Sequence, residues 1–184
     1  MDLHPGLDRE TILEIVREVS FKVRKANNEV FKPYGIRLSN KNLSEIIGKI
    51  MERTSAEILS KKLGYEVRNA QSDSEPDLLF TRINRPLEIK VTSTQDGWIG
   101  GEFSERPYDY FLVSWGGDYD EYFVAYLHLD KKDWHSNISK RFYGPTYSAK
   151  TLYENKKKLV LLGDFSVSSR GSVKIRREIV RRSV

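Results

Sequence analysis

The strongest candidates for catalytic residues in the sequence are two acidic residues and a lysine. Asp77 opens a short apolar segment, and ten residues separate it from Glu88, which is followed by Ile89 and Lys90 in a second such segment. Side chains two apart in a β-strand point the same way, so we expect Glu88 and Lys90 on one face and Ile89 in the core. The polar residues 81–86 predict a turn, and the resulting hairpin would bring Asp77 near Glu88.

This set of side chains suits phosphodiester hydrolysis. Two carboxylates supply hard oxygen ligands for Mg²⁺, for which Mn²⁺ can substitute, and Mg²⁺ commonly binds one or two carboxylates together with waters and phosphate oxygens. Such a metal neutralises phosphate charge and lowers the pKa of a bound water, while a neighbouring lysine orients that water. Asp, Glu and Lys are common residues, so an ordinary surface hairpin with an ion pair is the alternative interpretation of the bare spacing.

The wider segment resembles a known motif. Glu75-Pro76-Asp77, followed after ten residues by Glu88-Ile89-Lys90-Val91-Thr92-Ser93, is similar to the PD-(D/E)xK nuclease motif. The upstream order of helix, strand and hairpin also matches, and the resemblance spans residues 43–93. It implies an α/β fold with a central mixed β-sheet flanked by helices, like that of restriction endonucleases.

The resemblance also implies roles at the matching positions. Asp77 and Glu88 would be metal ligands, and the main-chain carbonyl of Ile89 would complete the protein's share of the coordination. Lys90 would assist the attacking water. The cofactor would be Mg²⁺, and no small-molecule cofactor is expected.

Many members of that family add a carboxylate from the preceding helix. Counted at 100° per residue, Glu57 lies within about 60° of the centre of the helix's apolar stripe, whereas Glu52 lies on the opposite face. We therefore predict Glu57 as the fourth catalytic residue, with Glu52 as the alternative.

Two helices are expected before the strands. Apolar residues at three- and four-residue steps predict helices over 9–31, capped by Asp8, and over 43–63, closed by Gly64. The later chain favours strands, and the glycine-rich stretch 97–101 favours a loop. Six strands are predicted, at 65–67, 78–80, 87–92, 108–115, 121–129 and 158–162. We expect one domain over 1–184, with an N-terminal helix in 1–40, a catalytic core in 43–93 and a basic DNA-contacting region in 131–184.

Charge is distributed unevenly along the 184 residues. The formal net charge is +5, but residues 93–130 carry −7 and residues 131–184 carry +10. A strongly basic segment is typical of polyanion binding, and a solvated basic face is the alternative. Within that segment, cations alternate with aromatic residues around a Gly-Pro turn. The candidate DNA contacts are Lys140, Arg141, Tyr143, Lys150, Arg176 and Arg177.

Composition excludes other classes of protein. The chain has no cysteine, which excludes disulfides and Cys-ligated metals, and its 3 histidines are too far apart in sequence to favour an all-His zinc site. No apolar run approaches the roughly 20 residues of a membrane span, and the first residues lack the layout of a secretory signal. We expect a soluble, cytoplasmic protein with no membrane partner.

Within the resemblance, two kinds of nuclease compete. The chain has about 40 residues before the core helix and about 90 after the motif, mass that sequence recognition and dimerisation require. We therefore expect a Mg²⁺-dependent type II restriction endonuclease that cuts double-stranded DNA at a short palindromic sequence as a homodimer. The helix at 9–31 is a candidate dimer face, although it can equally pack on its own domain. The alternatives are a structure-specific nuclease of the Holliday junction resolvase type and a non-catalytic DNA-binding module.

Overall fold

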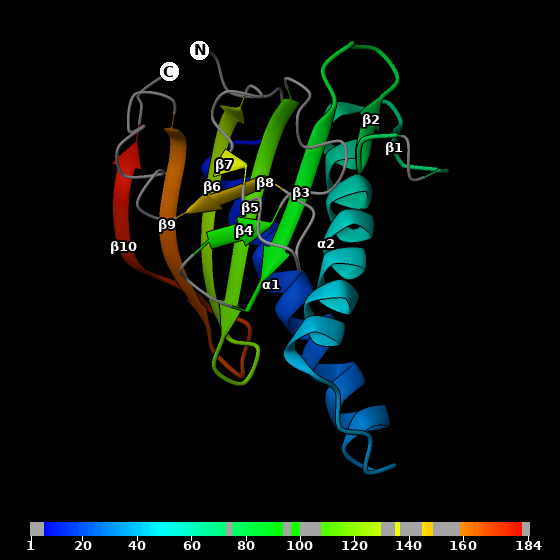
Figure 1. Ribbon diagram of the computed structural model, residues 1–184, viewed down its shortest axis with the longest axis vertical. Helices are drawn as coiled ribbons and strands as arrows, with labels where there is room; N and C mark the ends of the chain where they lie inside the picture. Colours follow the sequence, from blue (N-terminus) through cyan, green and yellow to red (C-terminus); the bar gives the residue numbers. More distant parts are fainter. Residues whose placement is uncertain are drawn as a thin grey trace.

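Two helices and a mixed seven-stranded sheet dominate the computed structural model (Figure 1), which describes residues 6–72, 75–93, 97–99, 108–129, 135–136, 145–148 and 159–181. The helices are α1 (Arg9–Ala26), continued by the π-helix η1 (Asn27–Phe31), and α2 (Asn40–Leu63). The predicted α/β class with a central mixed sheet flanked by helices is confirmed. The strands are β1 (Val67–Asn69), β2 (Leu78–Phe80), β3 (Leu87–Thr92), β4 (Gly97–Ile99), β5 (Tyr108–Gly116), β6 (Glu121–Leu129), β7 (His135–Ser136), β8 (Pro145–Ser148), β9 (Leu159–Val167) and β10 (Val173–Arg181).

The large sheet has the strand order β1-β2-β3-β5-β6-β9-β10. Strands β3 and β5 run parallel, with Glu88 opposite Tyr110, and the other neighbouring pairs are antiparallel. Strand β2 pairs with β3 through Leu78 and Leu87 alone. Within the described residues, the rest of the outer edge of β3 therefore has no strand partner, and α2 runs beside this edge (Figure 1).

Helix α1 packs its apolar side on the sheet. Its first turn is capped by Asp8, whose Oδ1 accepts the Thr11 N–H at 2.9 Å. Figure 1 draws the helix behind the sheet, and it contacts α2 and β9. This stripe is buried inside the chain's own fold, so it is not available as the dimer face considered above. Its buried apolar members are Ile12, Ile15, Val16, Val19 and Val23.

Helix α2 begins three residues earlier than predicted. The N-cap is Ser39, whose Oγ accepts the Asn42 N–H at 3.2 Å. The helix ends as predicted at Gly64, whose φ of 68° is the left-handed conformation that glycine adopts readily.

The predicted strand bounds agree with the structure for three of the six strands. The bounds of β2, β3 and β6 are those predicted, whereas β1 lies two residues later than expected. The stretch 97–101 was expected to be a loop, but residues 97–99 form β4, which pairs with β8. The pairing partner lies almost fifty residues away in sequence, so a local pattern gave no sign of it. The C-terminal basic segment likewise contains a strand, β10, paired antiparallel with β9.

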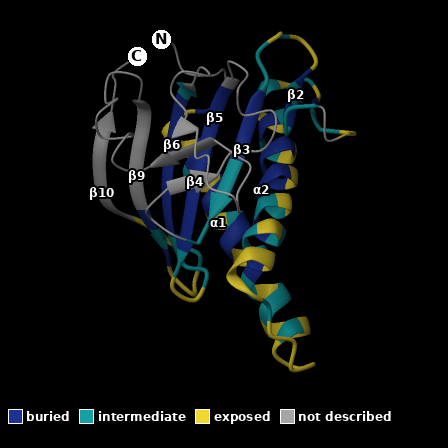
Figure 2. Ribbon diagram, viewed as in Figure 1, coloured by how far each residue is buried: buried dark blue, intermediate teal, exposed yellow. Residues whose placement is uncertain are grey.

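The centre of the sheet is buried on both faces. Phe111 and Val113 face the core shared with the helices, while Tyr110 and Leu112 point to the opposite side, and all four are fully buried. Figure 2 shows the middle of the sheet in the buried colour, and Figure 1 draws the three-stranded sheet β4-β8-β7 in front of it. Burial on both faces explains why β5 has a continuous apolar run instead of an alternating one. Among the described helices, none is long and apolar enough to cross a membrane.

Candidate active site

Strands β2 and β3 hold the two motif carboxylates against each other. The Asp77 N–H donates to Glu88 Oε2 at 3.2 Å, and the Ile89 N–H donates to Asp77 Oδ2 at 2.7 Å. Each carboxylate is thus tied to the main chain of the opposite strand. The predicted hairpin and the predicted approach of Asp77 to Glu88 are confirmed, as is the burial of Ile89 in the core.

Pro76 leaves the Ile89 carbonyl without a donor from β2. The N–H and C=O of one strand residue point to the same side, and the Ile89 N–H points toward β2 because Asp77 accepts it. Extending the Leu78–Leu87 register by two positions would place Pro76 opposite Ile89. Proline has no N–H, so β2 offers no main-chain donor there. The Ile89 carbonyl therefore faces the sheet edge beside Asp77, where it can coordinate a cation.

The helix carboxylate that faces the motif is Glu52. Its residue is 9% exposed, and its ionisation is opposed by the Asp77 carboxylate, which places the two groups within electrostatic reach. Gly48, one helical turn earlier, faces strand β3, because a Cβ built there would lie 3.8 Å from Val91 Cγ2. Positions four apart share a helix face, so Glu52 continues the face that Gly48 presents to β3.

The predicted placement of Glu57 is wrong. Its side chain is 54% exposed and accepts hydrogen bonds from Lys22 Nζ at 3.1 Å and Arg53 Nε at 3.3 Å. The error arises because α2 is buried on two sides, one against α1 and the other against β1 and β3. The centre of the apolar stripe was the average direction of all the apolar residues of the helix. Because that average included the residues that face α1, the centre lay toward α1 and away from the motif.

Two lysine ammonium groups neutralise the glutamates. Lys90 Nζ forms an ion pair with Glu88 Oε1, and Lys49 Nζ contacts both oxygens of Glu52 at 2.9 and 2.8 Å. The Lys90 side chain is 20% exposed, whereas that of Lys49 is 76% exposed. Lys49 was not predicted as a site residue, although its place one helical turn before Glu52 was an available signal.

Burial raises the pKa of both glutamates. For Glu52, lost hydration is the largest cause, the Lys49 hydrogen bond opposes it, and the Asp77 carboxylate raises the pKa further. For Glu88, burial again comes first, Lys90 opposes it, and Asp77 again adds to the rise. Asp77 thus lies beside two poorly hydrated glutamates, and such an arrangement favours a bound cation.

These pKa shifts predict that Glu52→Gln stabilises the protein without divalent metal. A raised pKa in the folded state means that ionised Glu52 costs stability, and this cost appears as the pH rises above the ordinary value of 4.5. We expect the melting temperature of Glu52→Gln at pH 8 in chelator to rise by about 2–4 °C, the effect of roughly 1 kcal/mol in a domain of this size. The gain should vanish near pH 4, as differential scanning calorimetry would show.

Glu57→Gln is the matched control, with the opposite sign. The hydrogen bond from Lys22 lowers the pKa of Glu57, so its ionised form supports the fold above pH 4.5 and loses this effect as the pH falls. Glu57→Gln should therefore not raise the melting temperature at pH 8. A Glu52→Gln protein that melts at or below the parent temperature at pH 8 would contradict the assigned environment.

Two further contacts fix the segments on either side of β2. Before β2, Arg68 holds Glu75 in a two-pronged ion pair at 3.0 and 2.9 Å. After β2, Arg85 of the turn forms an ion pair with buried Asp109 on β5. Asp109 also accepts a hydrogen bond from Tyr126 at 2.9 Å and lies 2.9 Å from His128 Nδ1. These contacts tie the segment before β2 to β1 and the turn after β2 to β5, so the carboxylates sit on a rigid support. Glu75, which precedes the motif, is thus a structural clamp.

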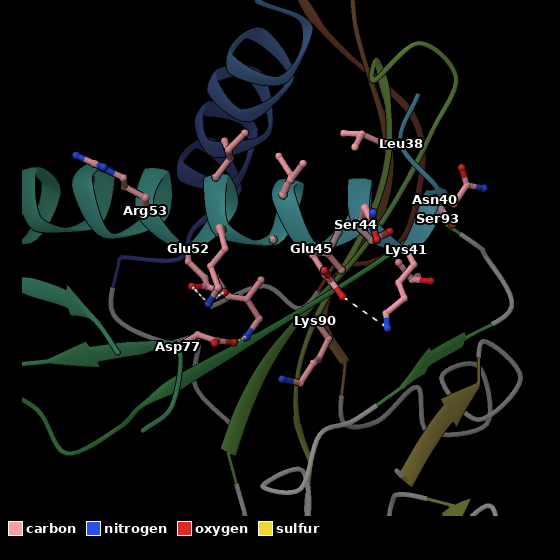
Figure 3. A pocket seen from close by; sticks show the side chains of 18 residues that line it. Leu38, Asn40, Lys41, Ser44, Glu45, Glu52, Arg53, Asp77, Lys90 and Ser93 are labelled. Carbon is pink, nitrogen blue, oxygen red and sulfur yellow. Dashed lines mark hydrogen bonds and ion pairs between the residues drawn. The ribbon is translucent and has the colours of Figure 1, made fainter. Parts of the chain in front are cut away.

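An open groove lies between α2 and the unpaired edge of β3. Its volume is about 1530 Å³, and Glu52, Asp77 and Lys90 lie at one end. Figure 3 shows Glu52 on the helix above Asp77, with Lys90 on β3 below the helix. From this end the groove follows α2 back toward its first turn, where Asn40 and Lys41 line it.

The residues at this end of the groove fit a hard divalent cation. Mg²⁺ usually takes one or two carboxylates plus waters and phosphate oxygens, and Asp77 and Glu88 with the Ile89 carbonyl supply that share. Within the described ranges, no three Asp, Glu or His side chains are already gathered as a metal cluster. The carboxylates are instead balanced by Lys49 and Lys90. A metal ion would compete with these ammonium groups for the same oxygens.

The predicted DNA contacts lie mostly beyond what the structure describes. Lys140, Arg141, Tyr143 and Lys150 fall outside the described residues. Arg176 and Arg177 lie in β10, but their side chains are also outside the described set. These six assignments stay predictions.

Comparison with known proteins adds no relative. No protein-family model matches the chain, and no curated protein matches it in sequence.

Proposed function

We propose that the protein is a Mg²⁺-dependent endonuclease of the PD-(D/E)xK type that hydrolyses phosphodiester bonds of duplex DNA. The observation that carries this proposal is the position of Asp77, whose main chain is hydrogen-bonded to Glu88 and whose carboxylate lies within electrostatic reach of Glu52, at one end of an open groove. Two buried glutamates beside an aspartate are costly to the fold and are characteristic of functional sites. We also propose that the fold is restriction-endonuclease-like and that the protein acts in the cytoplasm.

Each residue has a chemical task in this proposal. Asp77, Glu88 and the Ile89 carbonyl would hold the metal ion, which when bound would neutralise phosphate charge and acidify a water. Lys90 is held beside Glu88 and can donate hydrogen bonds to the attacking water and to the phosphate oxygens. Glu52 would accept a hydrogen bond from that water and orient it. Lys49 would then be free of Glu52 and could contact a neighbouring phosphate oxygen.

We further propose cleavage at a short palindromic sequence by a homodimer. A chain with one such site hydrolyses one strand, so two copies are needed to break both strands together. A two-fold dimer reads two equivalent half-sites, which makes the recognised sequence palindromic. The strands β6, β9 and β10 and the second sheet lie beyond the hairpin and provide the additional mass that recognition and dimerisation require.

Plasmid cleavage in different metals tests the reaction. We expect supercoiled plasmid to be cut with Mg²⁺ or Mn²⁺ and to stay intact with chelator. With Ca²⁺ we expect binding without cutting, because its looser coordination supports binding better than reaction. Gel electrophoresis with single-turnover amounts of protein reads the result. A protein that binds DNA but never cuts it in Mg²⁺ or Mn²⁺ would favour a non-catalytic binding module. Cutting that follows four-way junctions regardless of sequence would favour a resolvase.

A further inference from the structure

A projecting turn separates the two helices. Residues 30–42, here named the tip, run from the end of η1 into the first turn of α2. Figure 1 shows the tip extending beyond the lower end of the sheet, and Figure 2 shows it mostly in the exposed colour. The catalytic and metal-binding residues proposed above all lie outside the tip.

The tip is positively charged throughout. It contains Lys32, Arg37 and Lys41, all exposed, and no acidic residue occurs from Val30 to Ser44. Lys41 lies 4.0 Å from Glu45, an exposed pair of the kind that contributes little. Among the described residues, no ion pair involves Lys32 or Arg37. This cationic surface is available to an anionic partner.

The tip also presents apolar side chains on a fixed backbone. Tyr34 is 78% exposed and Ile36 is 44% exposed. The turn is closed by main-chain hydrogen bonds: the Gly35 N–H donates to Lys32 at 3.1 Å and the Ile36 N–H donates to Phe31 at 2.8 Å. Gly35 has a φ of 64°, which a residue with a side chain rarely adopts. The backbone conformation of the turn therefore holds Tyr34 in an exposed position.

The tip is continuous with the candidate active site. Leu38, Asn40 and Lys41 line the same groove that ends at Glu52 and Asp77. Eleven residues of helix separate Lys41 from Glu52, which corresponds to about 16 Å. Duplex DNA advances 3.4 Å per base pair, so the tip would meet the duplex about five base pairs from the cut phosphate.

We propose that the tip is a DNA-contacting surface that grips the duplex beside the cleavage position. Lys32, Arg37 and Lys41 neutralise backbone phosphates, and Tyr34 lies against the sugars and base edges between them. The proposal rests on the endonuclease function proposed above and adds a binding surface that the sequence analysis did not assign. A second copy of the chain fits less well, because a two-fold contact would set the same cations against each other.

Salt-dependent binding tests the tip directly. Fluorescence anisotropy would measure the affinity of the full chain for a labelled 30-base-pair duplex in Ca²⁺, between about 50 and 200 mM salt. The triple variant Lys32→Gln, Arg37→Gln and Lys41→Gln should lower the slope of log affinity against log salt by about 2–3, since each phosphate contact contributes about 0.9. The control triple Arg9→Gln, Arg17→Gln and Lys25→Gln, on the exposed side of α1, should leave the slope unchanged.

Tyr34→Ala gives a second, charge-neutral reading. We expect its affinity to fall about tenfold at every salt concentration with no change in slope. Circular dichroism melts would confirm that the variants fold. If the parent chain binds no DNA, the proposed function and the tip both fail. If the parent binds but the tip triple keeps the parent slope, the tip alone fails. A Tyr34→Ala variant that loses self-association in ultracentrifugation, yet binds DNA normally, would assign the tip to a second copy and overturn the proposal.

Discussion

Asp77→Asn should abolish DNA cleavage while leaving the fold and DNA binding intact. The amide keeps the size of the side chain, and its oxygen can still accept the Ile89 N–H that Asp77 Oδ2 accepts at 2.7 Å. What disappears is the negative charge that would bind the metal ion. We expect the single-turnover cleavage rate in Mg²⁺ to fall at least about a thousandfold, the size of effect found when a preorganised catalytic contact is lost.

DNA binding separates this loss from unfolding. Removing one negative charge beside the phosphate path should keep the affinity or raise it slightly. Asp118→Asn is the control, since Asp118 is an exposed acidic residue in the turn before β6, and it should cut at the parent rate. Metal binding gives an independent reading: Mn²⁺ should raise the melting temperature of the parent and of Asp118→Asn but not that of Asp77→Asn. An Asp77→Asn enzyme that cuts within about tenfold of the parent would refute the metal-site assignment.

The second large effect distinguishes two glutamates on one helix. Glu52→Gln should lower the cleavage rate at least about a hundredfold, as expected for a group that positions the reacting water. Glu57→Gln should change the rate less than about twofold, because Glu57 is half exposed and pairs with Lys22 and Arg53. Both substitutions remove one charge and keep the side-chain size, so each is the control for the other.

The decisive result is which of the two variants loses more of its cleavage rate. A larger loss in Glu57→Gln than in Glu52→Gln would mean that the helix turns its other face to the substrate. Equal, small losses in both variants would mean that the reaction needs no helix carboxylate and that Glu52 is buried for another reason. Comparing both rates in Mg²⁺ and in Mn²⁺ would show whether either loss follows from weaker metal binding.

The catalytic hairpin could be predicted because its determinants are local. Alternating residues in 87–92, a polar turn at 81–86 and the proline before Asp77 act within seventeen residues, and β2 and β3 have the predicted bounds. The caps at Asp8 and Gly64 are local in the same sense. Strands β4 and β10 were not predicted as strands. The partner of β4 lies almost fifty residues away in sequence. Strand β10 lies in the basic segment that was expected to contact DNA, although its partner β9 directly precedes it.

The helix carboxylate could not be predicted because it depends on packing partners. Helical periodicity shows which residues avoid water but not which neighbour covers them. Helix α2 is covered by α1 on one side and by β1 and β3 on another. The average direction of its apolar residues therefore matched neither side. Gly48 marked the side that approaches β3, since a small residue allows close packing there. Asp109 was missed for a similar reason: its partners Arg85 and Tyr126 come from other strands and turns.

Sequencing the ends of plasmid DNA digested in Mg²⁺ tests the central proposal most directly. One experiment reports whether the protein hydrolyses phosphodiester bonds, at which sequence, and with what offset between the strands. We predict discrete ends that recur at one short palindromic sequence, appear with the parent chain and are absent with Asp77→Asn. Plasmid that stays intact with folded, DNA-binding protein in both Mg²⁺ and Mn²⁺ would contradict the account, and so would cutting that Asp77→Asn retains.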